Sequence, residues 1–306
     1  MQIYREMSIG TAKATDEERA TAPHHLIDFL SPNESYSADN YRADALRVVE
    51  DITARGRLSI FVGGTGLYID TVTRGATDGV PPSDPERRAR ILDSVGGDAH
   101  VLWERLYEVD PESAEKTHEN NTKRVLRALE IYDATGKPKS YFDALTKESA
   151  SPVRIAMITL DFHDRELLYR RIDERVDAML EAGLLEEAKG LYEQGYLACG
   201  TTAAQAIGYK ELLSYIEGET TLEAAVEELK LASRRYAKRQ LTWFRRENAY
   251  RLYIDTEDGQ MRDVKDITDE LFAVARKIIG NDFTLNFNEE NNENERTEKT
   301  SCGRRA

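Results

Sequence analysis

The sequence lacks the features that define several large classes of protein. Only two of its 306 residues are cysteine, Cys199 and Cys302, and no Cys-x-x-Cys or Cys/His cluster occurs. This argues against a disulfide framework and a thiolate metal site, and it fits a reducing cytoplasm. No apolar run is long enough for a membrane span. The N-terminus has neither the basic start nor the apolar stretch of a secretory signal.

Positive charge is also scarce over the chain as a whole. There are 42 Lys and Arg residues against 56 Asp and Glu residues, which gives a net charge of −14. Such a balance argues against non-specific coating of nucleic acid, but it does not exclude a local basic groove. With 40% hydrophobic residues, the chain has enough apolar material for one large domain or two smaller ones.

The order of helices and short apolar runs predicts an α/β fold with a parallel sheet. Residues 37–54 have the spacing of an amphipathic helix, and Leu58–Val62 follows as a strand that leads into Gly63-Gly64-Thr65-Gly66. Helix, strand and glycine loop in this order are typical of parallel sheets whose functional loops follow strand ends. Further strands are predicted at 153–160 and 252–254, and helices at 165–181, 185–194, 221–246 and 264–278.

A proline-rich break interrupts this pattern. After Pro81-Pro82-Ser83-Asp84-Pro85 the sequence has helical patterning and no convincing strand up to Leu145. We therefore predict an α/β core formed by 1–83 and 150–280, with a helical insertion at 84–149. The polar tail at 281–306 has too little apolar surface to order itself and is predicted to be disordered.

The Gly63–Gly66 loop is the first candidate site. Glycines let backbone amides approach a ligand, the start of the following helix favours an anion, and Thr65 adds a hydroxyl. The alternative is a tight turn between strand and helix with no ligand. The loop alone does not decide between the two.

A basic stretch at 234–246 is the second candidate, because it contains no acid in an otherwise acidic chain. A helical face of this kind suits a phosphate backbone, and Trp243 and Phe244 can stack on bases. The alternative is a solvated face with a core tryptophan. The cations that partly share one face are Arg235, Lys238, Arg239 and Arg246.

Two smaller clusters are more ambiguous. Arg171 and Arg175 share a helical face and can clamp phosphate oxygens, although neighbouring acids can neutralise them instead. His24-His25 has no further ligand at a metal-binding spacing and is assigned a structural or hydrogen-bonding role. No Ser-His-Asp or Cys-His arrangement stands out.

Seven short motifs follow one another along the chain, and together they resemble the bacterial tRNA dimethylallyltransferase family. The resemblance runs from Met1 to about Asp255. It implies a P-loop-NTPase-like parallel sheet flanked by helices, with an inserted all-helical domain that binds the anticodon stem-loop. The motifs are Met-Gln-Ile-Tyr-Arg at 1–5, Ile-Gly-Thr-Ala-Lys at 9–13, Pro-His-His-Leu-Ile-Asp at 23–28, Phe61–Tyr68, Arg-Val-Leu-Arg-Ala-Leu-Glu-Ile at 124–131, Gln-Ala-Ile-Gly-Tyr-Lys-Glu at 205–211 and Arg234–Arg245.

The resemblance also implies an activity. Members transfer a dimethylallyl group from dimethylallyl diphosphate to N6 of the adenosine 3′-adjacent to the tRNA anticodon, with Mg²⁺ present. The base is extruded into a channel, the usual solution for chemistry on a base. We accordingly expect a cytoplasmic transferase with tRNA and dimethylallyl diphosphate as partners, monomeric and without a membrane association.

The resemblance also implies roles for individual residues. Thr65 matches a threonine near the leaving oxygen, Arg88 an arginine beside the substrate, and Arg175 an arginine on the diphosphate. These are the catalytic candidates, and no protein metal ligand is assigned. The diphosphate-binding candidates are Gly63, Gly64, Thr65, Arg171 and Arg175. The tRNA-binding candidates are Met1, Gln2, Gln205, Ala206, Ile207, Gly208, Tyr209, Lys210, Arg235, Lys238 and Arg239.

The chain departs from the family at its start. The family's Gly-x-x-x-x-Gly-Lys-[Ser/Thr] loop and the aspartate that accepts the N6 proton fall before Met1, which leaves roughly 35 residues without a counterpart. We expect a start farther upstream, with a real truncation as the alternative, and little or no activity for the chain as it stands. A non-catalytic tRNA-binding remnant is the competing function. A P-loop nucleotide kinase is disfavoured, because such an enzyme needs no RNA-binding surface.

Overall fold

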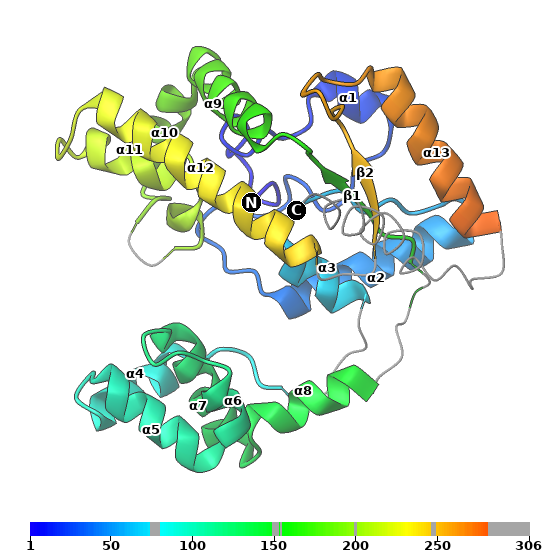
Figure 1. The fold of residues 1–306 in the computed structure, drawn as a ribbon. Coiled ribbons are helices and arrows are strands. Elements are labelled where there is room, and N and C mark those ends of the chain that lie inside the picture. Colours follow the sequence, from blue (N-terminus) through cyan, green and yellow to red (C-terminus); the bar gives the residue numbers. More distant parts are fainter. Residues whose placement is uncertain (74–79, 149–152, 154, 199–200, 246–248, 281–306) are drawn as a thin grey trace, which may run out of the picture. The chain divides into compact units, whose positions relative to one another are not determined.

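The computed structural model describes residues 1–73, 80–148, 153, 155–198, 201–245 and 249–280. The chain divides into two compact units, one formed by Met1–Leu67 with the part from Ile155 onward, the other by Tyr68–Arg154 (Figure 1). Each unit has a hydrophobic core of its own. The predicted insertion at 84–149 lies inside the second unit, and the predicted tail at 281–306 lies outside the described residues.

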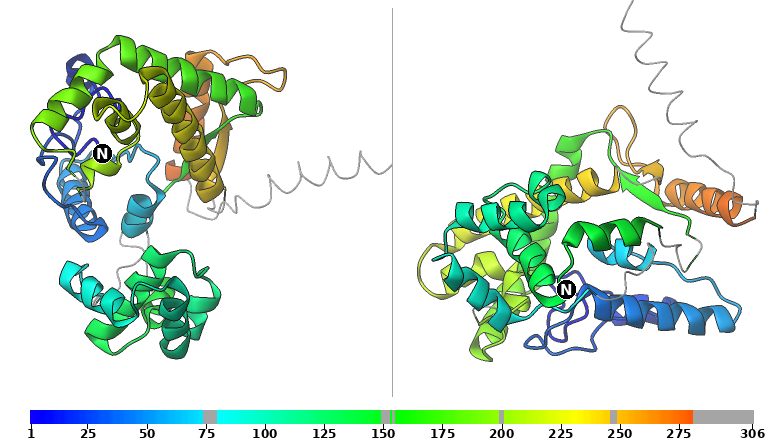
Figure 2. Two further views of the ribbon diagram at one scale, coloured as in Figure 1. Left: turned by 90° about the vertical axis from the view of Figure 1, so that its left-hand side faces the viewer. Right: turned by 90° about the horizontal axis from the view of Figure 1, so that it is seen from below.

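The first unit contains a parallel pair of strands. β1 (Ile158–Asp161) pairs in parallel with β2 (Tyr250–Tyr253), and both strands overlap segments predicted to be strands. α12 (Leu222–Phe244) lies on one side of the pair and α13 (Val264–Gly280) on the other (Figures 1 and 2). Parallel pairing with flanking helices confirms the predicted α/β class.

The other helices of this unit begin at recognisable caps. α2 (Ala38–Ala54) begins after Ser37, whose hydroxyl accepts from the Asn40 amide at 3.0 Å. α9 (Arg165–Glu181) begins after Asp164, whose carboxylate accepts from the Glu166 amide at 2.8 Å. The remaining elements are α1 (Asp16–Thr21), α3 (Gly66–Thr73, which crosses into the second unit), α10 (Leu184–Glu193), η1 (Ala203–Gln205) and α11 (Tyr209–Ile216).

The core of the first unit joins the N-terminal segment to α10 and α11. The side chains of Tyr4, Met7, Leu184, Tyr209 and Leu212 are fully buried in one cluster. The segment that carries residues 1–13 is thereby fixed against helices almost two hundred positions away in the sequence. None of the described helices combines the length and the apolar character that a membrane crossing requires.

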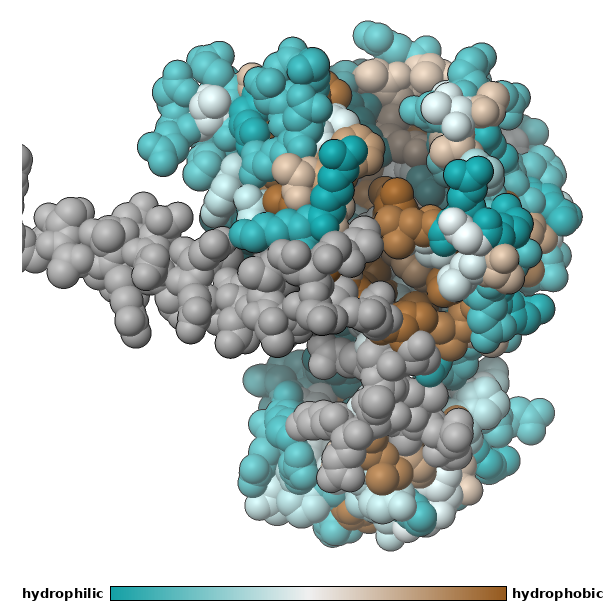
Figure 3. All heavy atoms as spheres, turned by 90° about the vertical axis from the view of Figure 1, so that its right-hand side faces the viewer, coloured by the Kyte–Doolittle hydropathy of each residue, from teal (hydrophilic) through white to brown (hydrophobic). Residues whose placement is uncertain are grey.

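One predicted strand is not formed. In the structure Leu58–Val62 belongs to no ladder with any described segment. Its side chains are turned outward, with Ile60 78% and Val62 93% exposed. Figure 3 shows apolar side chains gathered in a hollow on a face of the first unit. The apolar pattern was read correctly, but a strand also needs a backbone neighbour, and no described segment supplies one.

The second unit is helical in its described residues. Its core forms where α4, α5 and α7 meet, with Leu102, Leu106 and Val125 fully buried. The helical patterning predicted after the proline-rich break is confirmed. The helices are α4 (Pro85–Ser94), α5 (Ala99–Val109), α6 (Pro111–Glu115), α7 (Thr122–Thr135) and α8 (Lys139–Glu148).

A buried carboxylate connects α4 to α7. Glu130 on α7 is fully buried and pairs with Arg127 at 2.7 Å and with Arg88 at 3.2 Å. It also accepts a hydrogen bond from the Asp84 amide, just before α4. Burial raises the pKa of Glu130, but these donors outweigh it and hold the pKa below its usual value.

We predict that Glu130→Gln destabilises the second unit by about 2 kcal/mol, because it leaves two arginines without their charged partner. Since the folded pKa is depressed, the contribution of Glu130 is fully present above about pH 4.3 and is lost as pH falls through the folded value. Unfolding measured by denaturant at pH 7 and at lower pH should show the difference between wild type and variant shrinking in acid.

The matched control is Glu108→Gln, which makes the same charge change at an exposed position of α5. Its free energy of unfolding should stay within about 0.5 kcal/mol of wild type. A difference between Glu130→Gln and wild type that is independent of pH would contradict the ion-pair explanation.

Candidate functional site

The Gly63–Gly66 loop lies directly against α12. A Cβ added at Gly64 would meet Cδ of Gln240 at 2.5 Å, and one added at Gly66 would meet Cδ1 of Trp243 at 2.5 Å. Ordinary contacts begin near 3.4 Å, so the ring of Trp243 leaves no room for a side chain at Gly66, whereas at Gly64 the flexible Gln240 side chain would have to move. The loop is therefore a tight turn whose backbone is fixed by a neighbouring helix.

Trp243 is used for this packing. Its ring is half-buried and faces the backbone of Gly66, and its indole N–H is buried without a hydrogen-bond partner among the described residues. This corresponds to the core tryptophan that the sequence left open as an alternative to base stacking. Phe244 beside it is also half-buried.

Thr65 differs from its neighbours because it is exposed at the tip of the loop. Its hydroxyl is thus accessible while the backbone on either side of it is constrained. Arg88, the second catalytic candidate, lies on α4 of the other unit and is held by Glu130. The predicted roles of both residues stay predictions.

Arg171 and Arg175 are exposed on α9. Asp173 and Asp177, on the same helix, form the ion pairs with α12. At 3.6 residues per turn, the two arginines fall on the opposite side of α9 from these acids. No described contact joins them to Thr65, so the diphosphate site that combines them with the glycine loop stays a prediction.

The basic face of α12 is present as predicted. Arg235, Lys238 and Arg239 are exposed, and their spacing spreads them over adjacent turns. Arg235 lies 3.8 Å from Glu228, and the Arg239 guanidinium lies 5.6 Å from the centre of the Tyr236 ring. Arg246, the remaining member of the predicted face, lies outside the described residues.

The N-terminal segment is held by hydrogen bonds of Gln2, a predicted tRNA-binding residue, and of Lys13. Gln2 donates to the carbonyls of Thr11 at 3.1 Å and Ala12 at 3.0 Å. Buried Lys13 donates to the Tyr4 carbonyl at 2.7 Å and pairs with Asp28. These bonds fix the backbone of residues 2–13, while the side chains of Met1 and Gln2 stay exposed.

Glu187 was missed by sequence reasoning although it organises a whole loop. Its carboxylate accepts from the amides of Ser8, Ile9 and Gly10 at 2.9 to 3.1 Å, and from the Tyr209 hydroxyl at 2.6 Å. Burial and this carboxylate raise the pKa of Tyr209. Nothing in the sequence around Glu187 distinguishes it from its acidic neighbour.

The residues of the Gln205–Lys210 motif differ in their exposure to solvent. Gln205 and Lys210 are exposed and Ile207 is half-buried, whereas Ala206, Gly208 and Tyr209 are buried. A Cβ at Gly10 would meet the Tyr209 ring at 2.7 Å, so this ring forms the floor of the Ile9-Gly10-Thr11 turn. Tyr209 therefore positions this turn, and its predicted role in tRNA binding stays a prediction.

Two further buried acids lie at the carboxyl ends of the strands. Asp255, after β2, accepts from the amides of His163 and Asp164 at 2.8 Å each. Asp161, at the end of β1, pairs with Arg245 at 3.2 Å. Each acid follows an apolar strand in the sequence, which is the signal that could have identified them.

The histidine pair lies outside these clusters. His24 contacts the Ala22 carbonyl through Nδ1 at 2.8 Å, and both histidines are exposed. In the part of the chain that the structure describes, no three His, Cys, Asp or Glu side chains are placed to hold a metal ion.

Comparison with known proteins matches most of the chain. A family model described as IPP transferase matches residues 2–247. The tRNA dimethylallyltransferase of Anoxybacillus flavithermus is 46% identical over 259 residues, which cover 84% of this chain and 81% of that protein. That of Carboxydothermus hydrogenoformans is 42% identical over 276 residues, which cover 90% and 86%.

Solved structures give the same relationship. The tRNA isopentenylpyrophosphate transferase of Bacillus halodurans is 41% identical, with a TM-score of 0.63, and the match covers 91% of this chain and 86% of that one. A eukaryotic dimethylallyltransferase acting on tRNA is 30% identical, with a TM-score of 0.73 over 93% of this chain and 73% of that one.

We predict that Gly66→Ala costs about 1–3 kcal/mol of folding free energy, because its methyl group meets the rigid Trp243 ring. Gly64→Ala should cost less, since the flexible Gln240 side chain can rotate away. The free energy of unfolding of each variant, measured by denaturant, checks the order. Gly190→Ala is the control: it has open space in α10 and should be neutral or stabilising by up to about 1 kcal/mol. Equal effects of Gly66→Ala and Gly190→Ala would contradict the packing described above.

Proposed function

This chain belongs to the IPP transferase family, and on that premise we propose that it transfers a dimethylallyl group to tRNA. The donor is dimethylallyl diphosphate and the acceptor is N6 of the adenosine 3′-adjacent to the anticodon. The N6 lone pair attacks the primary allylic carbon, and the bond from that carbon to the diphosphate oxygen breaks. The oxygen keeps the electron pair, and the N6 proton leaves to a general base.

The observation that carries this proposal is the fixed glycine loop beside a basic helix. Gly64 and Gly66 are packed against α12, which leaves Thr65 as an exposed hydroxyl on a constrained backbone. Preorganised donors of this kind stabilise charge that develops during a reaction. In the proposed reaction that charge develops on the leaving diphosphate oxygen, toward which the Thr65 hydroxyl would donate.

Arginines would supply the remaining positive charge. Arg171 and Arg175 on α9 are proposed to bind the diphosphate oxygens, whose charge grows as the carbon–oxygen bond breaks. Arg88 is proposed to lie beside the substrate, with its guanidinium oriented by Glu130. No residue described here is assigned the role of general base.

RNA binding is proposed for the exposed face of α12 and the exposed ends of the 205–210 motif. Arg235, Lys238 and Arg239 suit backbone phosphates, and Gln205 and Lys210 present polar groups to solvent. We propose a cytoplasmic location, because the proposed substrate is tRNA. We further propose that it acts as a monomer.

Mg²⁺ is proposed as a companion of the donor diphosphate. The described residues offer no group of three ligating side chains for the ion. A hard cation of this type is commonly bound through phosphate oxygens and water. We therefore derive no step of the reaction through it.

The test is to incubate the protein with an anticodon stem-loop RNA and dimethylallyl diphosphate, and to measure diphosphate release and the mass of the RNA. The proposed function predicts that the RNA gains one dimethylallyl group, whereas the low activity expected from the sequence predicts that it gains little or none. Thr65→Ala should lower the rate at least about tenfold, the scale of one lost hydrogen bond to a charged group, and Thr65→Ser should retain most of it.

Thr53→Ala, at an exposed position of α2, is the matched control and should leave the rate unchanged. RNA binding without diphosphate release would refute transfer and would support a non-catalytic tRNA-binding protein. Equal rates for Thr65→Ala and Thr53→Ala would remove Thr65 from the mechanism.

A further inference from the structure

Two ion pairs join α9 to α12, but they do not continue along the full length over which the two helices face each other. Lys230 pairs with Asp177 at 2.7 Å, and Arg234 pairs with Asp173 at 2.6 Å. From the first pair to the second, the position advances four residues along α12 and goes back four residues along α9. Both pairs therefore lie on the facing sides of the two helices. A third pair with the same spacing would join Lys238 to residue 169. Residue 169 is a tyrosine and not an acid, so Lys238 has no carboxylate at this position.

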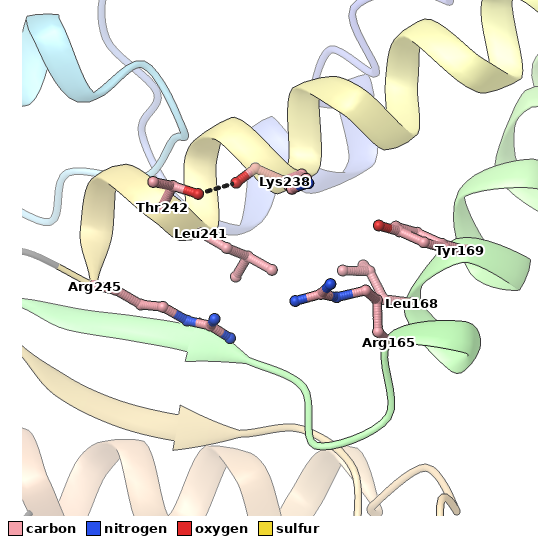
Figure 4. Close-up of a pocket in the computed structure, with 7 residues that line it drawn as sticks. All are labelled: Arg165, Leu168, Tyr169, Lys238, Leu241, Thr242 and Arg245. Atoms are coloured by element: carbon pink, nitrogen blue, oxygen red, sulfur yellow. Dashed lines mark hydrogen bonds between the residues drawn. The ribbon is translucent and has the colours of Figure 1, made fainter.

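A small pocket lies just beyond the last ion pair. Its volume is about 50 Å³, which exceeds the 10–15 Å³ or so that one water molecule needs. Figure 4 shows the guanidinium groups of Arg165 and Arg245 and the hydroxyl of Tyr169 pointing into the space between the helices. Lys238 lines the same pocket, and Leu168 and Leu241 give it apolar walls. It lies next to the carboxyl end of β1, the edge where α/β sheets usually bind ligands.

The charge in this pocket is unbalanced. Arg245 is paired with buried Asp161. Within the described part of the chain, no carboxylate lies within 4.0 Å of the charged groups of Arg165 and Lys238. Three cations around one small cavity repel one another, and a bound anion would relieve that repulsion. Arginine forks, an ammonium group and a hydroxyl are the donors that a phosphate group binds best.

The position of the pocket decides which phosphate it suits. At 3.6 residues per turn, Lys238, Leu241 and Arg245 fall on one face of α12, and Gln240 and Trp243 fall on the opposite face. Gln240 and Trp243 are the residues that touch the glycine loop. A helix with its side chains is about 10–12 Å across. The pocket therefore lies on the side of α12 away from Gly64 and Gly66, and a phosphate bound in it does not contact the glycine loop.

We propose that this pocket binds one phosphate of the tRNA backbone, held by Arg165, Lys238 and Tyr169. The inference deepens the proposed function and rests on it for the identity of the RNA. Arg165 and Tyr169 on α9 thereby join the RNA-binding surface, to which the sequence had assigned no residue of α9. Free diphosphate offers the same oxygens, so the test must separate the two sources.

The test measures binding of an anticodon stem-loop RNA to the full chain over a range of salt concentrations. Arg165→Gln and Lys238→Gln should each weaken binding about tenfold and lower the slope of log K against log salt by about 0.7–0.9, the value for one phosphate contact. Tyr169→Phe should weaken binding about threefold and leave the slope unchanged, because it removes a neutral donor. Arg245 is left intact, since its loss would strand buried Asp161.

Arg170→Gln is the matched control, an exposed arginine of α9 that does not line the pocket. If Arg165→Gln and Arg170→Gln lower the RNA affinity equally, the proposal is overturned, because the affinity would then depend only on the net charge of the protein. Thermal unfolding of each variant shows whether the fold is retained.

A second arm titrates the same variants with inorganic diphosphate. Unchanged diphosphate affinity supports the RNA phosphate, whereas a loss confined to diphosphate assigns the pocket to that ligand and overturns the proposal. Absence of RNA binding by the unmodified chain would also overturn it. A chain that binds RNA through the pocket but transfers no prenyl group would refute the proposed function and leave this inference standing.

Discussion

The arrangement of the first unit depends on α12 meeting two different neighbours on opposite faces. One face approaches α9 through ion pairs of Lys230 and Arg234, and the other touches the backbone of Gly64 and Gly66. Ion pairs and apolar contacts hold α9 against α12, and the absence of Cβ atoms lets the loop approach this helix closely. The glycine loop that carries Thr65 and the exposed cations Arg235, Lys238 and Arg239 are thus connected through a single helix.

Buried acids complete this arrangement and explain how so acidic a chain can bind RNA. Asp161, Asp255 and Glu130 are buried, Glu187 is half-buried, and all four accept hydrogen bonds from backbone amides or arginines. Their negative charge is balanced inside the protein and does not face a ligand. The net charge of −14 therefore coexists with an exposed basic face on α12, because the two kinds of charge occupy different parts of the molecule.

Local features were predictable from the sequence and long-range partners were not. The helix at 165–181 was predicted to the residue, because its cap and its stop at Gly183 are local signals. The apolar run Leu58–Val62 was mistaken for a strand, since a ladder depends on a neighbour that periodicity does not reveal. Trp243 and Glu187 show the same limit, because a glycine loop and a turn nearly two hundred residues away determine what they do. The resemblance to a family supplied the activity, while Arg165 and Tyr169 emerged only from the geometry.

The central claim is that RNA meets the protein where α9 and α12 face each other, on the side of α12 opposite the glycine loop. The most direct measurement is photo-cross-linking of an anticodon stem-loop that carries photoreactive nucleotides, followed by mapping of the linked peptides by mass spectrometry. We expect the RNA to be cross-linked to peptides that contain residues 165–169 and 235–245. Cross-links found only outside α9 and α12, with RNA bound, would contradict the claim.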